Sequence, residues 1–211
     1  MPPSSRCESW CIYIVDDDDS VRRGFRRLLR SFGYQIEVFA NARSFLDADL
    51  ERWGCVILDV QLPDLTGLDL QTALAERDIV LPVIFVSGYG TIPMTVQAMR
   101  GGAIDFLQKP VSEPVLRSAV ERGLEEAARR CRQWHVTSQI QQRLNCLTPR
   151  EKQVFRLAVT GKLNKQIAGE LGTSEKTVKV HRARVMEKMR ASTFAELVRM
   201  AERLGVGGEP R

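Results

Sequence analysis

Residues 11 to about 125 alternate short apolar runs with amphipathic stretches. The apolar runs are rich in β-branched residues and do not alternate with polar ones, which predicts strands, several of them buried on both faces of a parallel sheet. These runs lie at residues 11–15, 36–39, 55–58, 82–86 and 103–107. The amphipathic stretches predict helices at residues 21–32, 42–49, 68–76 and 92–100, with a fifth from residue 113. Five strand–helix units predict a doubly wound α/β domain with a five-stranded parallel sheet.

The fifth helix is expected to continue beyond this α/β domain, past Gly123. Apolar residues along it step by four and three, as in a coiled-coil seam. They are Val120, Leu124, Ala127, Cys131 and Trp134. The seam spans few heptads, so a helical linker over residues 126–143 is the favoured interpretation and a true coiled coil is the alternative.

Residues 144–211 carry an all-α pattern. The segment from Thr148 to Glu151 is a capping box with proline at the first helical position, and it predicts a helix to about Val159. Three further helices are expected at residues 165–171, 175–189 and 194–204, bounded by glycines and by a capping serine. The second and third of the four, joined by a tight turn, have the arrangement of a helix-turn-helix.

Composition excludes several classes of protein. The 211 residues allow two small domains, and with 44% hydrophobic residues and no apolar run near the length of a membrane span, a soluble protein without membrane contact is expected. The five cysteines are odd in number and scattered, so neither a disulfide framework nor a zinc site is predicted, and a reducing cytoplasm fits. The first ten residues lack the features of an export signal and predict a short frayed leader.

Charge divides the chain into two parts. Residues 144–211 hold 14 lysines and arginines against 7 acidic residues, a net charge of +7. The first 143 residues hold 17 against 19, a net charge of −2. A basic C-terminal part beside a mildly acidic remainder indicates that one domain meets a polyanion while the other has a different task.

Side chains suited to phosphoryl chemistry follow the predicted strands. The first strand runs into four aspartates from Asp16, the third into Asp59, the fourth into Ser87 and the fifth into Lys109. The carboxyl ends of parallel strands meet at one sheet edge, so these groups should converge. Acidic runs and Ser-Gly turns are each common alone; their joint placement favours function. Clustered carboxylates need a cation, and oxygen ligands suit Mg²⁺; with a lysine and a hydroxyl nearby, a carboxylate can become an aspartyl-phosphate.

Residues 11–125 resemble the receiver domain of two-component response regulators. The segments that carry the resemblance are IVDDDDSVRRGFRRLLRSFGY, CVILDVQLPDLTGLDL and VIFVSGYGTIPMTVQAMRGGAIDFLQKP. The resemblance implies a flavodoxin-like receiver fold with Asp59 as phosphoacceptor. It implies a Mg²⁺ site formed by Asp16, Asp17, Asp59 and the backbone carbonyl of Gln61. It also implies that Lys109 pairs with the phosphoryl group and that the switch residues are Ser87 and Phe106.

Two details at this site are left open by the sequence. In receiver domains the peptide bond between Lys109 and Pro110 is usually cis, which the sequence does not show. Asp18 and Asp19 have no role in the family pattern, and we expect them to be solvated residues at the start of a helix.

The third helix of the basic domain has one apolar stripe that can face a core: Val178, His181, Val185 and Met189. The opposite face carries Lys176, Lys179, Val180, Ala183 and Glu187. Arg182 and Arg184 project to the two sides, where phosphates lie beside a helix in a major groove. A generic basic bundle with solvated charges is the alternative.

The segment LTPREKQVFRLAVTGKLNKQIAGELGTSEKTVKVHRARVMEKMRASTFAELVRMA resembles the LuxR-type four-helix DNA-binding domain. With the receiver, the whole chain is similar to the NarL/FixJ class of response regulators. The resemblance puts Lys179 and Val180 at base edges and makes Lys188 part of the family pattern, so that Lys188 joins the expected DNA-binding set. Ala183 stands where relatives can have lysine, which leaves the operator sequence open.

The resemblance implies a cytoplasmic transcription regulator. A sensor histidine kinase phosphorylates Asp59, the protein forms a homodimer, and the dimer binds double-stranded promoter DNA, with RNA polymerase as a further partner. Two alternatives remain: a DNA-binding regulator with a phosphorylation-independent receiver, and an aspartyl-phosphate phosphatase. The phosphatase needs an acid two residues after its nucleophile, where this chain has Gln61, so we expect no enzyme.

Overall fold

The computed structural model describes residues 10–50 and 52–207. Residues 1–9 of the expected N-terminal leader lie outside the described residues. The chain forms two compact units, which divide between Arg132 and Gln133, and we describe each unit by itself. Within the described part of the chain, no helix has the length and apolar character needed to cross a membrane.

The first unit contains a five-stranded parallel sheet in the order β2-β1-β3-β4-β5. The strands are β1 (Cys11–Val15), β2 (Gln35–Phe39), β3 (Gly54–Leu58), β4 (Val83–Ser87) and β5 (Asp105–Gln108). Every residue of β1, β3 and β4 is buried, which agrees with their non-alternating apolar sequences. The fifth strand begins at Asp105 rather than at Ala103, because pairing with β4 starts there.

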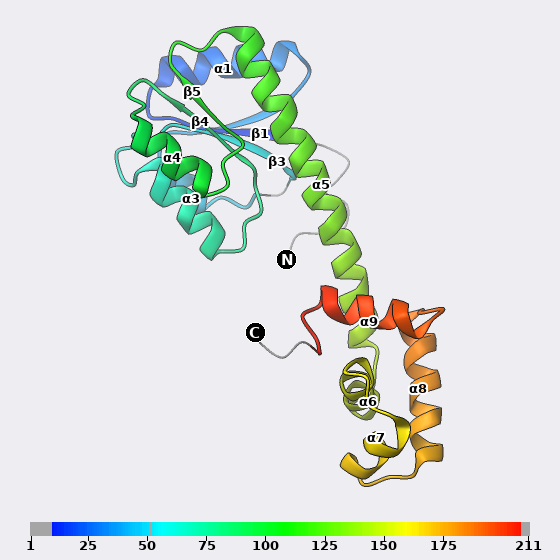
Figure 1. Cartoon of the computed structure of the whole chain (residues 1–211). Helices are drawn as coiled ribbons and strands as arrows, with labels where there is room; N and C mark the ends of the chain where they lie inside the picture. The colour runs from blue at the N-terminus through cyan, green and yellow to red at the C-terminus, as the bar shows by residue number, and fades with distance from the viewer. Residues whose placement is uncertain (1–9, 51, 208–211) are drawn as a thin grey trace. The chain divides into compact units, whose positions relative to one another are not determined.

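Helices cover both faces of this sheet (Figure 1). They are α1 (Asp19–Ser31), α2 (Ala42–Leu46), α3 (Gly67–Glu76), α4 (Ile92–Arg100) and α5 (Glu113–Asn145). One apolar cluster joins α1 and α5 to the sheet, and a second joins α2, α3 and α4 to its other face. The second helix ends at Leu46, three residues earlier than predicted. Asp47 and Asp49 follow, and continuing the helix would place their negative charges at its negative C-terminal end, which is unfavourable.

The fifth helix is one continuous element from Glu113 to Asn145, so the expected helical linker over residues 126–143 lies inside it. Among the cysteines that the structure describes, Cys11, Cys55 and Cys146 are free. Cys131 is disulfide-bonded, which the scattered spacing of the cysteines did not predict.

The second unit adds four helices to the end of α5. They are α6 (Pro149–Val159), α7 (Asn164–Glu170), α8 (Glu175–Met189) and α9 (Phe194–Arg203). The predicted core stripe of α8 is confirmed at Val178, Val185 and Met189, which are buried. Two separate apolar clusters hold the unit: one joins α6, α7 and α8, and the other joins α5, α6, α8 and α9.

The predicted capping box at the start of α6 is present and is tied to α8. The Thr148 hydroxyl accepts from the Glu151 N–H, and the Glu151 carboxylate accepts the Thr148 N–H at 2.8 Å. The same carboxylate oxygen pairs with Lys188 Nζ at 2.7 Å, although the Glu151 side chain is only 3% exposed. Lys188 and the cap hold the pKa of Glu151 below its usual range.

We expect Glu151→Gln to lower the free energy of unfolding of the second unit by about 1 kcal/mol at pH 7, because glutamine keeps the cap and removes the ion pair with the partly exposed Lys188. Because the pKa of Glu151 is lower in the folded state, its ionised carboxylate stabilises the fold at pH values above the unfolded-state pKa near 4.5. This stabilisation is lost as the pH falls through the folded-state pKa. The difference between variant and wild type should therefore shrink at pH 3. Hydrogen exchange of α6 amides in the full chain measures it. Glu187→Gln, at an exposed position of α8, is the control, and a pH-independent difference would contradict the assignment.

Candidate functional site

Backbone hydrogen bonds position the site at the carboxyl edge of the sheet. Three residues that follow strands each donate an N–H to a carbonyl on the neighbouring strand. The bonds run from Asp16 to Phe39 (3.2 Å), from Asp59 to Val15 (2.8 Å) and from Lys109 to Ser87 (2.8 Å). The sheet pairing therefore extends into the site, and the positions of these side chains follow from the strand order.

A close approach of α3 fixes the backbone behind Asp59. A Cβ atom on Gly67 would lie 2.2 Å from the Asp59 carbonyl oxygen, so only glycine lets α3 begin this near to β3. The Gly67 N–H donates to the Val60 carbonyl at 2.8 Å. The loop that carries Asp59 is therefore held from both ends.

An ammonium group lies between two buried carboxylates. Lys109 Nζ is 2.7 Å from Asp16 Oδ2 and 2.6 Å from Asp59 Oδ2, and the two aspartates are 2% and 6% exposed. Burial raises the pKa of Asp16, and the bond to Lys109 opposes that shift. Burial alone would lower the pKa of Lys109, but its hydrogen bonds to the two carboxylates outweigh burial and raise that pKa.

Three carboxylates at this edge could hold a divalent cation. Oxygen atoms of Asp16, Asp17 and Asp59 lie within 4.8 Å of one another. Together with the Lys109 ammonium they sum to a charge of about −2, which a divalent ion would neutralise. The Gln61 N–H donates to Asp59 Oδ1 at 3.2 Å, so the Gln61 backbone adjoins the same group. The donor set, made of hard oxygen atoms at a solvent-facing edge, fits Mg²⁺.

The expected switch residues adjoin one another through the β4–α4 loop. Ser87 is buried at the end of β4, and its Oγ accepts the Tyr89 N–H at 3.2 Å. The half-buried Phe106 ring stacks on Phe85 with a centroid separation of 6.0 Å. A Cβ atom on Gly90 would lie 2.6 Å from the Phe106 ring, so loop and ring are in close contact.

Two details left open by the sequence are settled by the structure. The Lys109–Pro110 peptide bond is cis. Asp18 is the N-cap of α1, where its carboxylate accepts from the Ser20 N–H, and Asp19 pairs with arginines in the first turns of that helix. Both are exposed, as expected.

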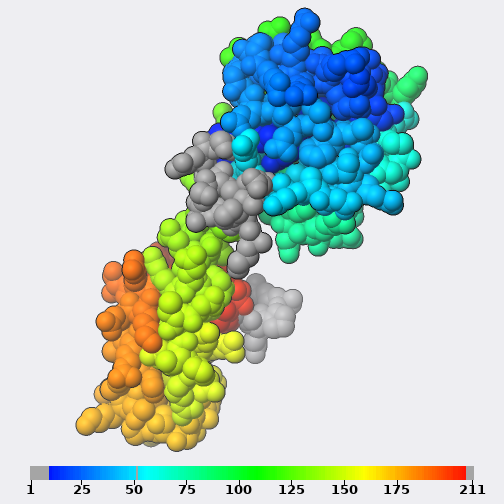
Figure 2. Space-filling view, turned by 180° about the vertical axis from the view of Figure 1, so that it is seen from behind, coloured from blue at the N-terminus to red at the C-terminus, as the bar shows by residue number. Residues whose placement is uncertain are grey.

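The exposed surface of α8 carries most of the residues expected at DNA. These are Lys176, Lys179, Val180, Ala183 and Arg184. In the space-filling view, orange atoms of α8 form an outer edge of the second unit (Figure 2). The two other expected residues have partners inside the unit: Lys188 pairs with Glu151, and Arg182 donates to Asn164 Oδ1 at 2.9 Å.

Sequence reasoning did not single out Asn164, Phe194 or Gly90 for their contacts at the two sites. The sequence pattern places Phe194 at the start of a helix and indicates no contact for Asn164. Their contacts with Arg182 and Phe106 join elements 12 or more residues apart. Neither periodicity nor spacing signals such contacts.

Comparison with known proteins agrees with this geometry. Residues 12–121 match the response regulator receiver domain, and residues 145–201 match the luxR family of bacterial regulatory proteins. Transcriptional regulatory protein FixJ of Azorhizobium caulinodans is 42% identical over 201 residues, which cover 94% of this chain and 95% of that protein. The chain belongs to the NarL/FixJ class of response regulators.

Other response regulators of this class are similarly close. Nodulation protein W of Bradyrhizobium diazoefficiens is 44% identical over 196 residues, 92% of this chain and 86% of that protein. A solved structure of response regulator StyR superposes with a TM-score of 0.73 at 44% identity, covering 92% of this chain and 99% of that one. The receiver-class fold and the transcription-regulator class predicted for this response regulator are thereby confirmed.

We expect Lys109→Gln to lower the free energy of unfolding of the receiver by about 1–3 kcal/mol at pH 7, because two buried carboxylates lose their shared cation. The loss should shrink below pH 4, where Asp16, whose pKa burial already raises, takes up a proton and the repulsion ends. Urea unfolding at both pH values measures the effect. Arg100→Gln, at an exposed position of α4, should change little; an equal loss in that variant would contradict the role of Lys109.

Proposed function

We propose that a sensor histidine kinase transfers a phosphoryl group to Asp59, and that this regulator then forms a homodimer and binds promoter DNA through α8. The observation that carries the proposal is the convergence of Asp16, Asp59 and Lys109 at one sheet edge, with Nζ–O distances of 2.7 and 2.6 Å. Such clustering is what phosphoryl transfer to a carboxylate requires.

Asp16, Asp17, Asp59 and the Gln61 carbonyl would hold Mg²⁺. When bound, the ion supplies positive charge that stabilises the transferring phosphoryl group. The net charge of about −2 among the three carboxylates and Lys109 supports this assignment.

In the transfer, the phosphorus–nitrogen bond of a kinase phosphohistidine breaks, and a new bond forms between the phosphorus and an Asp59 carboxylate oxygen. Lys109, already 2.6 Å from Asp59 Oδ2, would pair with a phosphoryl oxygen. Pairing there would change its contact with Asp16, because the same ammonium holds both carboxylates.

The switch would run through the β4–α4 loop. If the Ser87 hydroxyl turns to a phosphoryl oxygen, it gives up the Tyr89 N–H that it accepts at 3.2 Å. The loop then moves, and Gly90 with it, which changes the packing of the Phe106 ring that Gly90 contacts. The phosphoryl charge thus shifts the contact between the loop and the Phe106 ring from one arrangement to another, as in a phosphorylation switch.

The dimer surface that we propose is the apolar stripe of α4. Ile92, Val96 and Met99 lie at helical spacings of four and three and are 81%, 42% and 45% exposed. The stripe directly follows the Tyr89–Gly90 loop, so movement of that loop reaches it. Pairing would bring two DNA-binding units together, which raises affinity for two half-sites without new contacts.

For DNA we propose that Lys176, Lys179, Val180 and Ala183 face the groove and that Arg184 meets a phosphate. The exposure of these side chains on one basic helix supports the assignment. RNA polymerase is the further partner expected of a transcription regulator. We propose that the protein acts in the cytoplasm, where a bacterial regulator meets promoter DNA.

Treatment with phosphoramidate and Mg²⁺ should add one phosphoryl group to wild type and none to Asp59→Asn, as read by intact mass. Asp17→Asn should lower incorporation, because it removes a metal ligand, while Asp18→Asn, which keeps the α1 cap, should not. Sedimentation of the same samples should show a dimer only in phosphorylated wild type. Equal incorporation in wild type and Asp59→Asn would move the acceptor elsewhere, and a dimer without the phosphodonor would favour a phosphorylation-independent receiver.

Lys179→Ala should reduce discrimination between operator and random DNA by about 1–3 kcal/mol, because it removes a contact to base edges. Arg184→Ala should weaken binding to all sequences alike and reduce the slope of log affinity against log salt by about 0.9. Titration with operator and random duplexes at several salt concentrations measures both. An unchanged specific-to-random ratio in Lys179→Ala would show that this face of α8 does not read bases.

A further inference from the structure

Arg182 lies where the two apolar clusters of the second unit meet, and that junction is incompletely filled. A cavity of about 170 Å³ remains between α6, α8 and α9. Its walls come from both clusters, including Val154 and Ala158 from one and Phe155 and Leu197 from the other. Apolar packing alone therefore does not close the contact between these helices.

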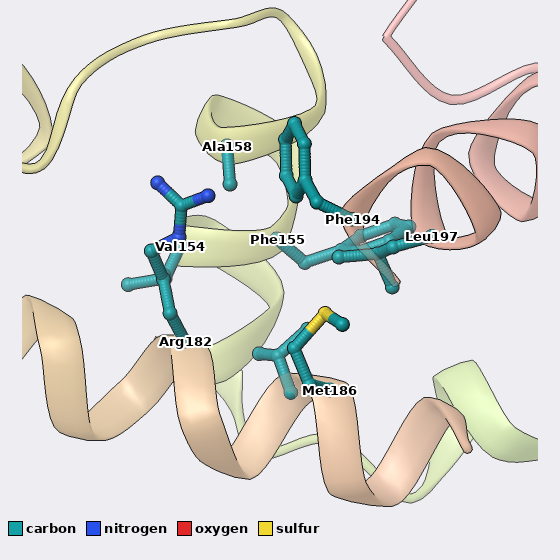
Figure 3. Close-up of a pocket in the computed structure, with 8 residues that line it drawn as sticks. Val154, Phe155, Ala158, Arg182, Met186, Phe194 and Leu197 are labelled. Carbon is teal, nitrogen blue, oxygen red and sulfur yellow. The ribbon is translucent and has the colours of Figure 1, made fainter. Parts of the chain in front are cut away.

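The Arg182 side chain spans this junction. It rises from α8, and its guanidinium faces the Phe194 ring (Figure 3), with 4.9 Å from Cζ to the ring centroid. On the other side, its Nη1 donates to Asn164 Oδ1 at 2.9 Å. One side chain thus connects the first residue of α7 and the first residue of α9 to the middle of α8.

We infer that Arg182 is a positioning residue for DNA reading and does not contact phosphate. The inference rests on the proposed DNA-binding function of α8. In a helix-turn-helix, the first helix crosses the DNA backbone while the second enters the groove, so their relative placement sets which bases the second helix meets. Arg182 links these two helices directly through Asn164.

The neighbouring Arg184 makes a matched comparison. Arg184 is exposed, whereas Arg182 is half-buried and its guanidinium is engaged by an amide oxygen and by an aromatic face. Binding a phosphate would require Arg182 to leave both partners. The two arginines, two residues apart on a basic helix, therefore have different tasks.

The test uses full-length protein treated with phosphoramidate and Mg²⁺, a random-sequence duplex, and a duplex selected from a random pool by wild type. Arg182→Ala should leave the salt slope for random DNA unchanged and reduce the selected-to-random affinity ratio roughly tenfold. Arg184→Ala should do the reverse, reducing the slope by about 0.9. A merely stabilising residue would leave the ratio unchanged.

Asn164→Ala keeps the charge and the apolar clusters and serves if Arg182→Ala fails to fold. It should also lower the selected-to-random affinity ratio. Where both single variants fold, the Arg182→Ala, Asn164→Ala double variant should lower this ratio no more than either single variant does. A slope reduced by about 0.9 in Arg182→Ala would overturn the inference, as would an unchanged ratio in Asn164→Ala. No binding of either duplex by wild type would instead overturn the proposed function, and this inference with it.

Discussion

A single ammonium group between two buried carboxylates is the contact on which the receiver depends. Asp16 and Asp59 follow adjacent strands, so parallel pairing of β1 with β3 brings two buried like charges together at the carboxyl edge of the sheet. Lys109 enters from β5, beyond β4, and its long side chain reaches both. The strand order thus creates the repulsion and also supplies the cation that reduces it.

On the proposed function, the same balance makes the site responsive to added charge. The Lys109 backbone is bonded to the Ser87 carbonyl, and the Ser87 hydroxyl is bonded to the loop that touches Phe106. A charge placed on Asp59 therefore meets a lysine and a hydroxyl that already hold other partners. If either side chain turns toward the new charge, its existing contact changes, and on the proposed function this change passes from the pocket to α4.

In the second unit, basic residues on one short helix divide between structural and surface positions. Lys188 closes the cap of α6 through Glu151, and Arg182 connects the starts of α7 and α9. Lys176, Lys179 and Arg184 remain exposed. The net positive charge of this unit therefore overstates the number of basic residues available to DNA, because some of them hold the helices in place.

The sequence by itself determined the architecture and the cluster of carboxylates and lysine at the sheet edge, because local patterns along the chain specify both. Non-alternating apolar runs specify buried parallel strands, and residues that directly follow such strands meet at one edge of the sheet. The sequence alone therefore predicts that Asp16, Asp59 and Lys109 lie together. Only the tertiary structure decided which basic residues of α8 are exposed. Arg182 and Arg184 are the same residue type on one helix, but only Arg182 is engaged inside the unit. Its partners Asn164 and Phe194 are brought next to it by folding, and the periodicity of α8 does not predict them.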